Sequence, residues 1–557
     1  MPDQPRRGAE LVVECLAAEG VTHVVGLPGT TVMDLIDALA RQDAVRYLST
    51  RHEQVAGFMA DGFSRAGGPL GVCLASRGPG AANLSVAVQN AHDESIPMLV
   101  LIGQVPGSIT GRRSFEEMDV VSAFRPFSKW AVEIQRPDRI PELLQRAVRT
   151  AVGGRPGPVV VSLPLEVLQE PTTASPASRV RIHPPAPDPA GIAEAARLLA
   201  AAERPAIIVG GGGAGGAQAH LALAEAAGAP VVTTWLRKNA VPNSHPAFLG
   251  SLGYGAHELS DRLVRDADVV VALGCRFSEF TTKRWTIVAP AADLVHVDID
   301  PGELGRIYPP RVGLVSDAAA AAGALAAALA PLVAADPARA TERVARREAL
   351  RKEYDEVAAL PEAPPAAEGV TSAALTRAVQ RLADRDGVVL VQDVHTFGPW
   401  VQRHVGFDRP RSYYGAAGGA MAWGFPAAMG MALARPDERV VALSGDGSFW
   451  MVAQDFETSV REQIPVVNVV VNNFAYGNTR DRQRFAHDER YLGVFLGNPD
   501  FAAFARLLGG HGARVTSDIG LLPAIEEALA QPGPSIVDVV QDRMEGLPTG
   551  LTPPAAR

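Results

Sequence analysis

The sequence predicts an α/β protein built from three doubly wound parallel-sheet domains. Short apolar runs alternate with helical patterns along all 557 residues, which is typical of parallel sheets covered by helices. Two Pro-rich stretches, 170–189 and 360–367, interrupt this alternation and are typical of linkers. The blocks between them have ordinary domain sizes. We therefore expect domains at residues 1–172, 190–345 and 368–557.

Composition limits the classes of function. A net charge of −9 argues against a nucleic-acid surface, and 47% hydrophobic residues are ordinary for a globular protein. Cys15, Cys73 and Cys275 lie in separate apolar runs, so we expect reduced core thiols and a cytoplasmic location. The first residues have no signal-peptide core, and the Ala-rich stretch 318–335 predicts a soluble helix. The sequence therefore predicts neither a membrane nor a nucleic-acid partner.

In the first block, a helix near 9–19 and a strand at 23–26 lead into a turn that contains Gly29. A short apolar run near 45–48 precedes a helix whose first turn carries Glu53. The simplest explanation for an acidic residue there is that it complements the helix dipole. The strand at 72–75 ends in Gly78-Pro79-Gly80, a turn that permits close backbone approach before the next helix.

In the middle block, a strand at 206–209 runs into a glycine-rich segment, 210–216, which suggests a nucleotide-binding turn of low specificity. Arg276 lies in the pattern Gly-Cys-Arg-Phe. A guanidinium is a natural bidentate partner for a carboxylate, and the alternative is a structural arginine in an interdomain ion pair.

In the third block, a helix at 372–384 precedes a strand at 388–391. Apolar runs at 440–443 and 466–471, with a Gly-rich turn at 444–448 and a helix at 449–463 between them, predict a βαβ unit. Asp446 and Asn473 then follow neighbouring parallel strands, where open α/β sheets bind ligands. A carboxylate and an amide oxygen suit a magnesium ion that also binds phosphate.

The pattern Gly445-Asp446-Gly447 followed by Asn472-Asn473 resembles the motif of thiamine diphosphate (ThDP) enzymes. The resemblance implies that the Asp446 and Asn473 side chains and the Ala475 carbonyl hold Mg²⁺ against the cofactor's diphosphate. The neighbouring residues expected at the cofactor are Gly445, Gly447, Ser448, Tyr476 and Gly477. The alternative is an ordinary βαβ unit with a Gly turn and an Asn turn.

Matches to this family occur in both outer blocks. The segment Arg51-His52-Glu53-Gln54 resembles the one whose glutamate protonates the cofactor's aminopyrimidine, which makes Glu53 a catalytic acid. His395 matches the first residue of a His-Gln pair that donates to the diphosphate, and Thr396 replaces the Gln but can still donate through its hydroxyl. Met421 matches the bulky apolar residue that bends the cofactor. The other implied cofactor contacts are Gly29, Gly78, Pro79, Asn83 and Gly419.

Three segments, Phe115-Glu116-Glu117, Gly154-Arg155-Pro156-Gly157-Pro158 and Gly274-Cys275-Arg276-Phe277, resemble the acetolactate synthase branch of this family. The resemblance implies a 2-oxo acid donor, whose decarboxylation leaves an enamine that adds to a second carbonyl compound. It also implies FAD in the middle domain; another adenine nucleotide or an empty site is the alternative. Arg276 matches the residue that holds the acceptor's carboxylate. Glu116 replaces that branch's active-site Gln, and Arg482 replaces a Trp.

The two departures favour a second carboligase or decarboxylase branch that acts on aldehyde, sulfoacetaldehyde or aromatic substrates. A flavin-dependent oxidase and a non-catalytic homologue are further alternatives. Because Glu53 and Asp446 belong to different domains, and the family builds each site from two subunits, we expect a homodimer or homotetramer.

Overall fold

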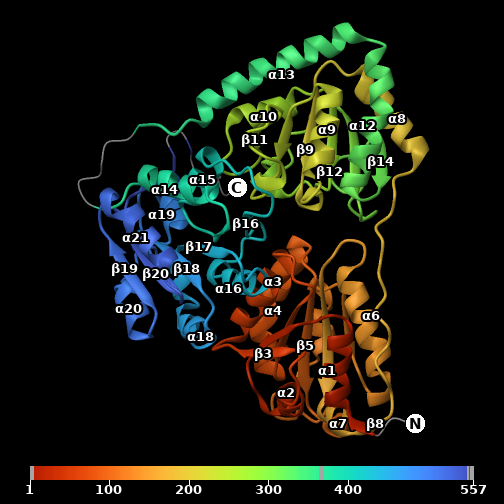
Figure 1. Ribbon diagram of the computed structural model, residues 1–557, viewed down its shortest axis with the longest axis vertical. Helices are drawn as coiled ribbons and strands as arrows, with labels where there is room; N and C mark the ends of the chain where they lie inside the picture. The colour runs from red at the N-terminus through yellow and green to blue at the C-terminus, as the bar shows by residue number, and fades with distance from the viewer. Residues whose placement is uncertain (1–4, 363–368, 549–550, 552–557) are drawn as a thin grey trace.

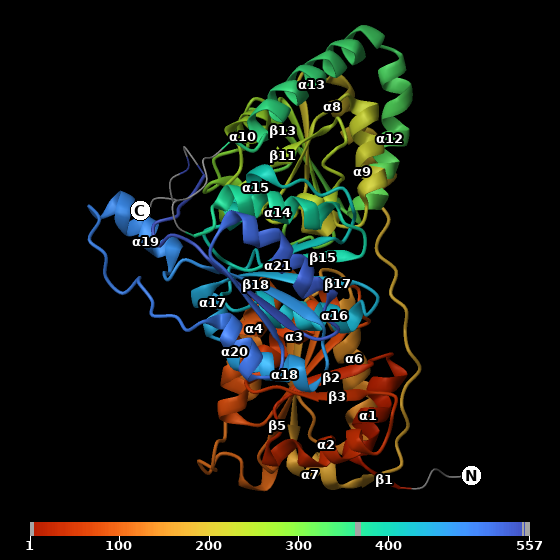
Figure 2. The same ribbon diagram turned by 60° about the vertical axis from the view of Figure 1, so that its left-hand side comes forward.

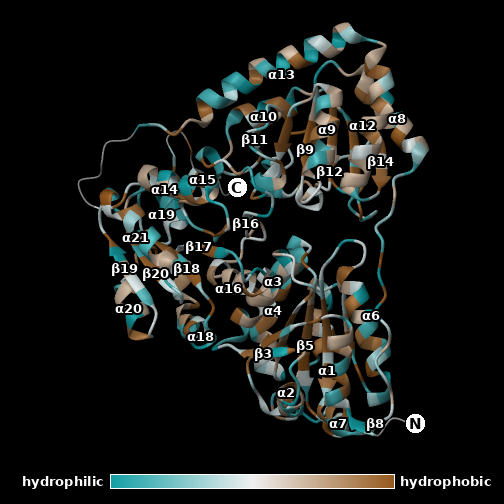
Figure 3. Ribbon diagram, viewed as in Figure 1, coloured by the Kyte–Doolittle hydropathy of each residue, from teal (hydrophilic) through white to brown (hydrophobic). Residues whose placement is uncertain are grey.

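The computed structural model describes residues 5–362, 369–548 and 551, and it contains three six-stranded parallel sheets (Figure 1). This confirms the predicted fold class. Residues 363–367 of the second expected linker and the outer ends of the first and third expected domains lie outside the described residues. The central strands of each sheet are apolar and buried on both faces, whereas several edge strands are partly exposed, and brown strands fill the interior of each lobe in Figure 3.

The first sheet has the order β3-β2-β4-β5-β7-β6. Its strands are β2 (His23–Gly26), β3 (Arg46–Ser49), β4 (Gly71–Ala75), β5 (Met98–Gln104), β6 (Trp130–Glu133) and β7 (Pro158–Pro164). The helices around it are α1 (Gly8–Ala18), α2 (Met33–Ala40), α3 (Glu53–Arg65), α4 (Gly78–Glu94), α5 (Val120–Phe124), α6 (Ile140–Val152) and α7 (Leu165–Gln169). A short antiparallel pair, β1 (Arg6–Arg7) with β8 (Pro171–Thr172), joins the start of this lobe to its end.

The middle sheet has the order β11-β10-β9-β12-β13-β14, which is the 3-2-1-4-5-6 order of dinucleotide-binding folds. Its strands are β9 (Pro205–Val209), β10 (Val231–Thr233), β11 (Phe248–Ser251), β12 (Val269–Leu273), β13 (Asp293–Asp298) and β14 (Val312–Val315). Its helices are α8 (Pro189–Ala201), α9 (Ala217–Ala227), α10 (Glu258–Arg265), α11 (Glu279–Thr282), α12 (Ala318–Ala334) and α13 (Pro337–Ala358).

The third sheet has the order β16-β15-β17-β18-β20-β19. Its strands are β15 (Val388–Gln392), β16 (Tyr413–Gly415), β17 (Arg439–Gly445), β18 (Val466–Asn472), β19 (His511–Val515) and β20 (Ser535–Val540). Its helices are α14 (Ser372–Asp384), α15 (Gly398–His404), α16 (Gly424–Ala434), α17 (Asp446–Trp450), α18 (Phe456–Arg461), α19 (Gly477–Ala486), α20 (Phe501–Leu507) and α21 (Asp518–Ala530).

Numbered within each domain, the strands of the first and third sheets follow the same order, 2-1-3-4-6-5. The strand order therefore reverses between β2 and β4 in one domain and between β15 and β17 in the other. Ligands bind outside the carboxyl ends of strands at such switch points. The segments after these four strands contain most of the residues expected at the cofactor.

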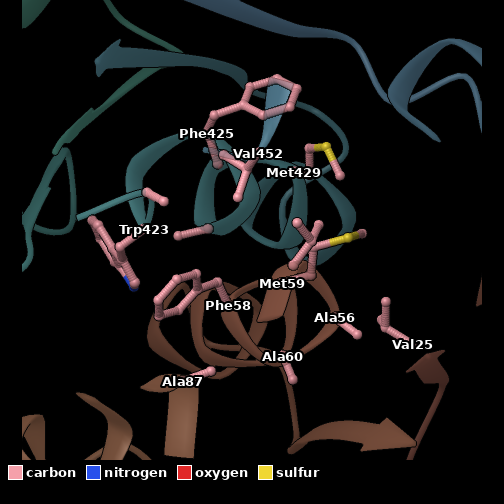
Figure 4. Packing of buried hydrophobic residues seen from close by; sticks show 14 of the residues in the cluster. Val25, Ala56, Phe58, Met59, Ala60, Ala87, Trp423, Phe425, Met429 and Val452 are labelled. Atoms are coloured by element: carbon pink, nitrogen blue, oxygen red, sulfur yellow. The ribbon is translucent and has the colours of Figure 1, made fainter. Parts of the chain in front are cut away.

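The first and third domains share a hydrophobic core, whereas the middle domain has a core of its own. Helices α3 and α16 cross at the centre of the shared core, where Met59 lies toward Met429 and Phe58 lies toward Trp423 (Figure 4). A Cβ atom at Gly430 would collide with the Met59 carbonyl, and one at Gly62 with the backbone of Ala427. Glycine therefore permits this close helix crossing. The two domains also lie against each other in the turned view of Figure 2.

Two local expectations need correction. The predicted turn at 444–448 is the end of β17 followed directly by α17, so Asp446 begins a helix. The predicted helix 449–463 is broken into α17, a 3₁₀ turn at Ala453–Asp455 and α18. The break accompanies a contact between domains, because the buried carboxylate of Asp455 accepts a hydrogen bond from the Arg51 backbone (2.7 Å).

The predicted helix at 318–335 is confirmed as α12. Among the described residues, no single helix meets the length and apolarity that crossing a membrane requires. The pair α12 and α13, bent by 119°, meets that test only when taken together.

Candidate active site

Asp446 is the centre of the polar group in the third domain. The residue is 2% exposed, and its Oδ2 accepts hydrogen bonds from the Asn498 side chain (2.7 Å) and the Ala475 backbone (3.2 Å). Burial raises the pKa of Asp446 to about 6, although these hydrogen bonds oppose the shift. No lysine or arginine in the described part of the chain forms an ion pair with it. A buried carboxylate without a cation is a natural ligand for one.

The other expected residues of this domain lie around Asp446. Asn473 donates to the Thr396 hydroxyl (3.3 Å), and Gly477 lies so close that a Cβ there would meet both side chains. Gly445 approaches His395, and Gly447 approaches the ring of Tyr476. The buried imidazole of His395 stacks on Phe397, and neither ring nitrogen has a well-formed hydrogen bond among the described residues. Burial lowers the pKa of His395 to about 4, so the ring is neutral near pH 7.

Ser448 connects this group to the segment that contains Met421. Its hydroxyl donates to Asp393 (2.7 Å) and accepts from the Ala422 backbone (2.6 Å). Gly419 and Ala422 flank Met421, and both have left-handed backbone conformations. The segment before α16 thus has a defined conformation beside the end of β17.

A second group of expected residues lies in the first domain. Glu53, at the first position of α3, is 6% exposed and accepts a hydrogen bond from Asn83 of α4 (2.9 Å). A Cβ at Gly80 would lie 3.0 Å from the Glu53 carboxylate. Gly78 and Pro79 form the first turn of α4, where Gly78 approaches the Glu116 carbonyl.

Gly29 completes this first-domain group. It follows β2 and lies against Ser76, which follows β4. The switch point of the first sheet therefore carries the residues expected at the aminopyrimidine. In the described ranges, no hydrogen bond or ion pair connects this group to the group around Asp446. One chain thus presents two half-sites.

Comparisons with known proteins assign the chain to a family. Residues 6–123, 192–325 and 393–539 match the N-terminal TPP-binding, central and C-terminal TPP-binding domains of thiamine pyrophosphate enzymes. A probable acetolactate synthase large subunit of Methanocaldococcus jannaschii is 34% identical over 99% of this chain and 94% of its own. Large subunits of acetolactate synthase isozymes 1 and 2 of Escherichia coli are 32% and 33% identical, over 99% of this chain and 96% and 98% of theirs.

The chain belongs to the thiamine pyrophosphate enzyme family. The resemblance to ThDP enzymes and to their acetolactate synthase branch is confirmed, and the cofactor of this protein is ThDP. Both half-sites fit this cofactor. The third domain offers a carboxylate without a cation and a buried, neutral imidazole, and the first offers a buried carboxyl group. In the described part, no group of three or more His, Cys, Asp or Glu residues could hold a metal ion.

Glu116, the departure from the acetolactate synthase pattern, is paired with a cation. Its carboxylate accepts from Arg77 Nε (2.9 Å), and the Arg77 guanidinium lies over the Phe115 ring. The backbone of Glu116 is left-handed, and Phe115 is 75% exposed. Arg77 therefore balances the charge of the Glu116 carboxylate.

Arg276 contacts the first domain and lines a large cavity. Its guanidinium donates to the Asp93 carbonyl near the end of α4, and burial lowers its pKa. The cavity, about 730 Å³, lies between all three domains. The glycines after β9, the start of α9 and Asp298 at the end of β13 also line it. Glycines and a helix N-terminus suit a pyrophosphate, and a carboxylate suits a ribose hydroxyl.

Arg237 modifies one wall of this cavity. It lines the cavity and donates to the Gly415 carbonyl (3.1 Å) and to Glu94.

Two residues of the site escaped the sequence analysis. Asn498 supports Asp446 from the loop before α20, and only the turn-like Gly-Asn-Pro-Asp pattern marks it. Asp393 accepts from Ser448 and from its neighbour Val394 (2.7 Å), and burial raises its pKa to about 6. Its position directly after β15, at the switch point, is the signal that could have identified it.

Proposed function

We propose that this protein is an acetolactate-synthase-type carboligase that depends on ThDP and Mg²⁺. It would decarboxylate a pyruvate-like 2-oxo acid and join the remaining fragment to a second carbonyl compound. Near full-length similarity to acetolactate synthase large subunits, together with both half-sites in one chain, carries this proposal. The cytoplasm stays the predicted location.

In this proposal, the third domain holds the cofactor's anionic end. Asp446, Asn473 and the Ala475 carbonyl bind Mg²⁺, and Asn498 orients Asp446 through its amide. His395 and Thr396, beside Asn473, donate hydrogen bonds to the diphosphate. The cofactor, when bound, supplies an electron sink for the electron pair of the C–C bond that breaks when CO₂ leaves. Mg²⁺ held by these residues would neutralise the Asp446 carboxylate, which has no cationic partner in the described part of the chain.

The first domain handles the proton. Glu53 shares a proton with the aminopyrimidine ring, and Asn83 fixes the carboxyl group for that transfer. Burial keeps water away from this carboxyl group, and Gly80 leaves the space beside it free of a side chain. Arg276 binds the acceptor's carboxylate once its fork leaves the Asp93 carbonyl.

A second candidate is another ThDP decarboxylase or carboligase branch, with aldehyde, sulfoacetaldehyde or aromatic substrates. Glu116 and Arg482 favour it, because Glu116, although paired with Arg77, places a carboxyl group where the acetolactate synthase branch has a neutral amide, and Arg482 stands in place of a Trp. A flavin-dependent oxidase is the weaker alternative, because the near full-length relatives are acetolactate synthase large subunits. We propose an adenine dinucleotide such as FAD as the cavity's ligand.

The active unit in this proposal is at least a homodimer. Glu53 and Asp446 lie in half-sites that no hydrogen bond connects within one described chain, whereas a two-fold pair would complete two sites.

Purified protein tests the proposed reaction when it is supplied with ThDP and Mg²⁺ and given a panel of 2-oxo acids, alone and in pairs with aldehydes. We expect CO₂ release from a pyruvate-like donor and a carboligation product of the summed mass. Release of CO₂ with only an aldehyde product would identify a decarboxylase. Peroxide formation with bleaching of a yellow preparation would identify an oxidase.

A further inference from the structure

The segment 416–423, between β16 and α16, is attached to the first domain of its own chain. The Gly418 backbone donates to Glu94, the last residue of α4. The Trp423 indole donates to Asp61 of α3 (3.0 Å). The Ala422 backbone donates to Ser448 (2.6 Å) within the third domain. Three anchors therefore flank the residues 419–421.

The two acidic anchors belong to one buried ionic cluster. Arg65 donates to Asp61 (2.8 Å) and to Glu94 (2.9 Å), and its guanidinium lies over the Trp423 ring at 4.8 Å. The side chains of Asp61 and Glu94 are at most 1% exposed. Arg237 of the middle domain also pairs with Glu94. All three domains thus meet at this carboxylate.

The cluster keeps Glu94 ionised. Burial alone would raise the pKa of Glu94, but Arg237 and Arg65 lower it to about 2. An ionised carboxylate accepts stronger hydrogen bonds than a neutral group does. The Gly418 amide is accordingly held by a charge-assisted bond, and a Cβ at Gly418 would meet the Asn90 side chain.

The conformation that these anchors hold is strained. Ala422 has φ of +69° and Gly419 has φ of +79°. A non-glycine residue in the left-handed region persists only where the surrounding structure determines it. Met421 lies between these two residues, and its neighbour Ala422 is tied to Ser448 in the first turns after β17.

We propose that Glu94 is a positioning residue that, with Asp61, fixes the segment 416–423 and so sets the place of Met421 against the cofactor. This inference rests on the proposed function and on the expectation from the sequence that Met421 supports the bent form of ThDP. Glu94 touches neither cofactor nor substrate in this role. A displacement of about 1 Å in such a positioning element can lower a rate about 100-fold.

Glu94→Gln tests the proposal, because it removes the charge and keeps an acceptor oxygen. Asp261→Asn is the matched control: Asp261 is also a fully buried carboxylate paired with one cation, Lys283, but it lies in the middle domain away from this segment. Two quantities are measured in the full-length protein. One is amide hydrogen exchange in cofactor-free protein, and the other is deuterium exchange at C2 of bound ThDP.

We expect Glu94→Gln to speed amide exchange in 416–423 about tenfold or more and to slow C2 exchange about 100-fold. Peptides from β9 and α14 should be unchanged, and Asp261→Asn should change neither quantity. Unchanged exchange in 416–423, or equal acceleration in every peptide and in the control, overturns the proposal.

Trp423→Phe provides an uncharged second variant should Glu94→Gln fail to fold. It removes the indole donor to Asp61 but keeps an aromatic ring, and the same two changes are expected and required. Should the wild-type protein bind no ThDP, the proposed function fails, and amide exchange in the cofactor-free protein still decides whether Glu94 fixes the segment.

Discussion

Asp446→Asn should stabilise the cofactor-free protein while abolishing its response to the metal. The carboxylate is 2% exposed and has no ion-pair partner in the described part of the chain, so its ionised form is disfavoured in the folded state. Burial raises its pKa from 3.8 to about 6. Asparagine has a similar shape and cannot ionise, so it escapes this penalty.

The size and sign of the effect follow from the raised pKa. At about 1.4 kcal/mol per pKa unit, the penalty at Asp446 approaches about 3 kcal/mol when the folded carboxylate is ionised. Stability from the neutral carboxyl group is fully present below pH 3.8 and is lost as the pH rises to about 6. The advantage of the variant should therefore grow by about 1.5 kcal/mol between pH 5.0 and 7.5.

Urea unfolding of the metal-free protein at these two pH values measures this difference. Asp455→Asn is a matched control, because burial also raises the pKa of Asp455 to about 6 and it lies outside the half-site. The free energy of unfolding of Asp455→Asn should depend on pH as that of Asp446→Asn does. Unlike Asp446→Asn, the control should keep the stabilisation by Mg²⁺ with ThDP, which is about 2.7 kcal/mol at a ligand concentration of 100 times the dissociation constant. Equal pH dependence for wild type and Asp446→Asn would refute the reasoning.

Three further outcomes are expected. Glu53→Gln keeps an acceptor for Asn83 but cannot share a proton, so turnover should fall about 10²–10⁴-fold while ThDP affinity is retained. Near wild-type turnover would exclude Glu53 as the acid that shares a proton with the aminopyrimidine. Mixing Glu53→Gln with Asp446→Ala subunits, each nearly inactive alone, should restore one site per mixed dimer; mixed dimers without activity would place the whole site in one subunit. Gly430→Ala should lower the melting temperature through about 1–3 kcal/mol of overpacking against Met59, whereas Gly323→Ala, exposed in α12, should raise it slightly.

The regular elements could be predicted because each depends on local pattern. The apolar runs that begin at Val440 and Val466 form β17 and β18, which are neighbours in one parallel sheet. The predicted strand at 23–26 matches β2. The predicted helix at 372–384 matches α14. Continuous apolar sequence bounded by Gly or Pro leaves few alternatives in such folds.

What the sequence could not predict depends on partners far away in the chain. Arg480 and Asp481 lie in a charged stretch that predicts an exposed helix face, yet both are buried as an ion pair. Arg480 also donates to the Arg543 and Glu545 carbonyls of the C-terminal segment. Those acceptors offset the desolvation of the guanidinium, and no local pattern reveals them. The helix break at Asp455 has the same origin, because its donor is in the first domain.

The position of α3 connects the two half-sites that the outer domains present. The helix begins at Glu53 and reaches Asp61 about 12 Å further along its axis. In the proposed dimer, Glu53 would serve the partner's cofactor, while Asp61 holds the segment beside the Asp446 half-site of its own chain. A shift of α3 would then change proton transfer in one site and the place of Met421 in the other. The close crossing with α16 at Gly62 and Gly430 opposes such a shift. The two helix backbones are in direct contact there, with no side chain between them that could change its conformation.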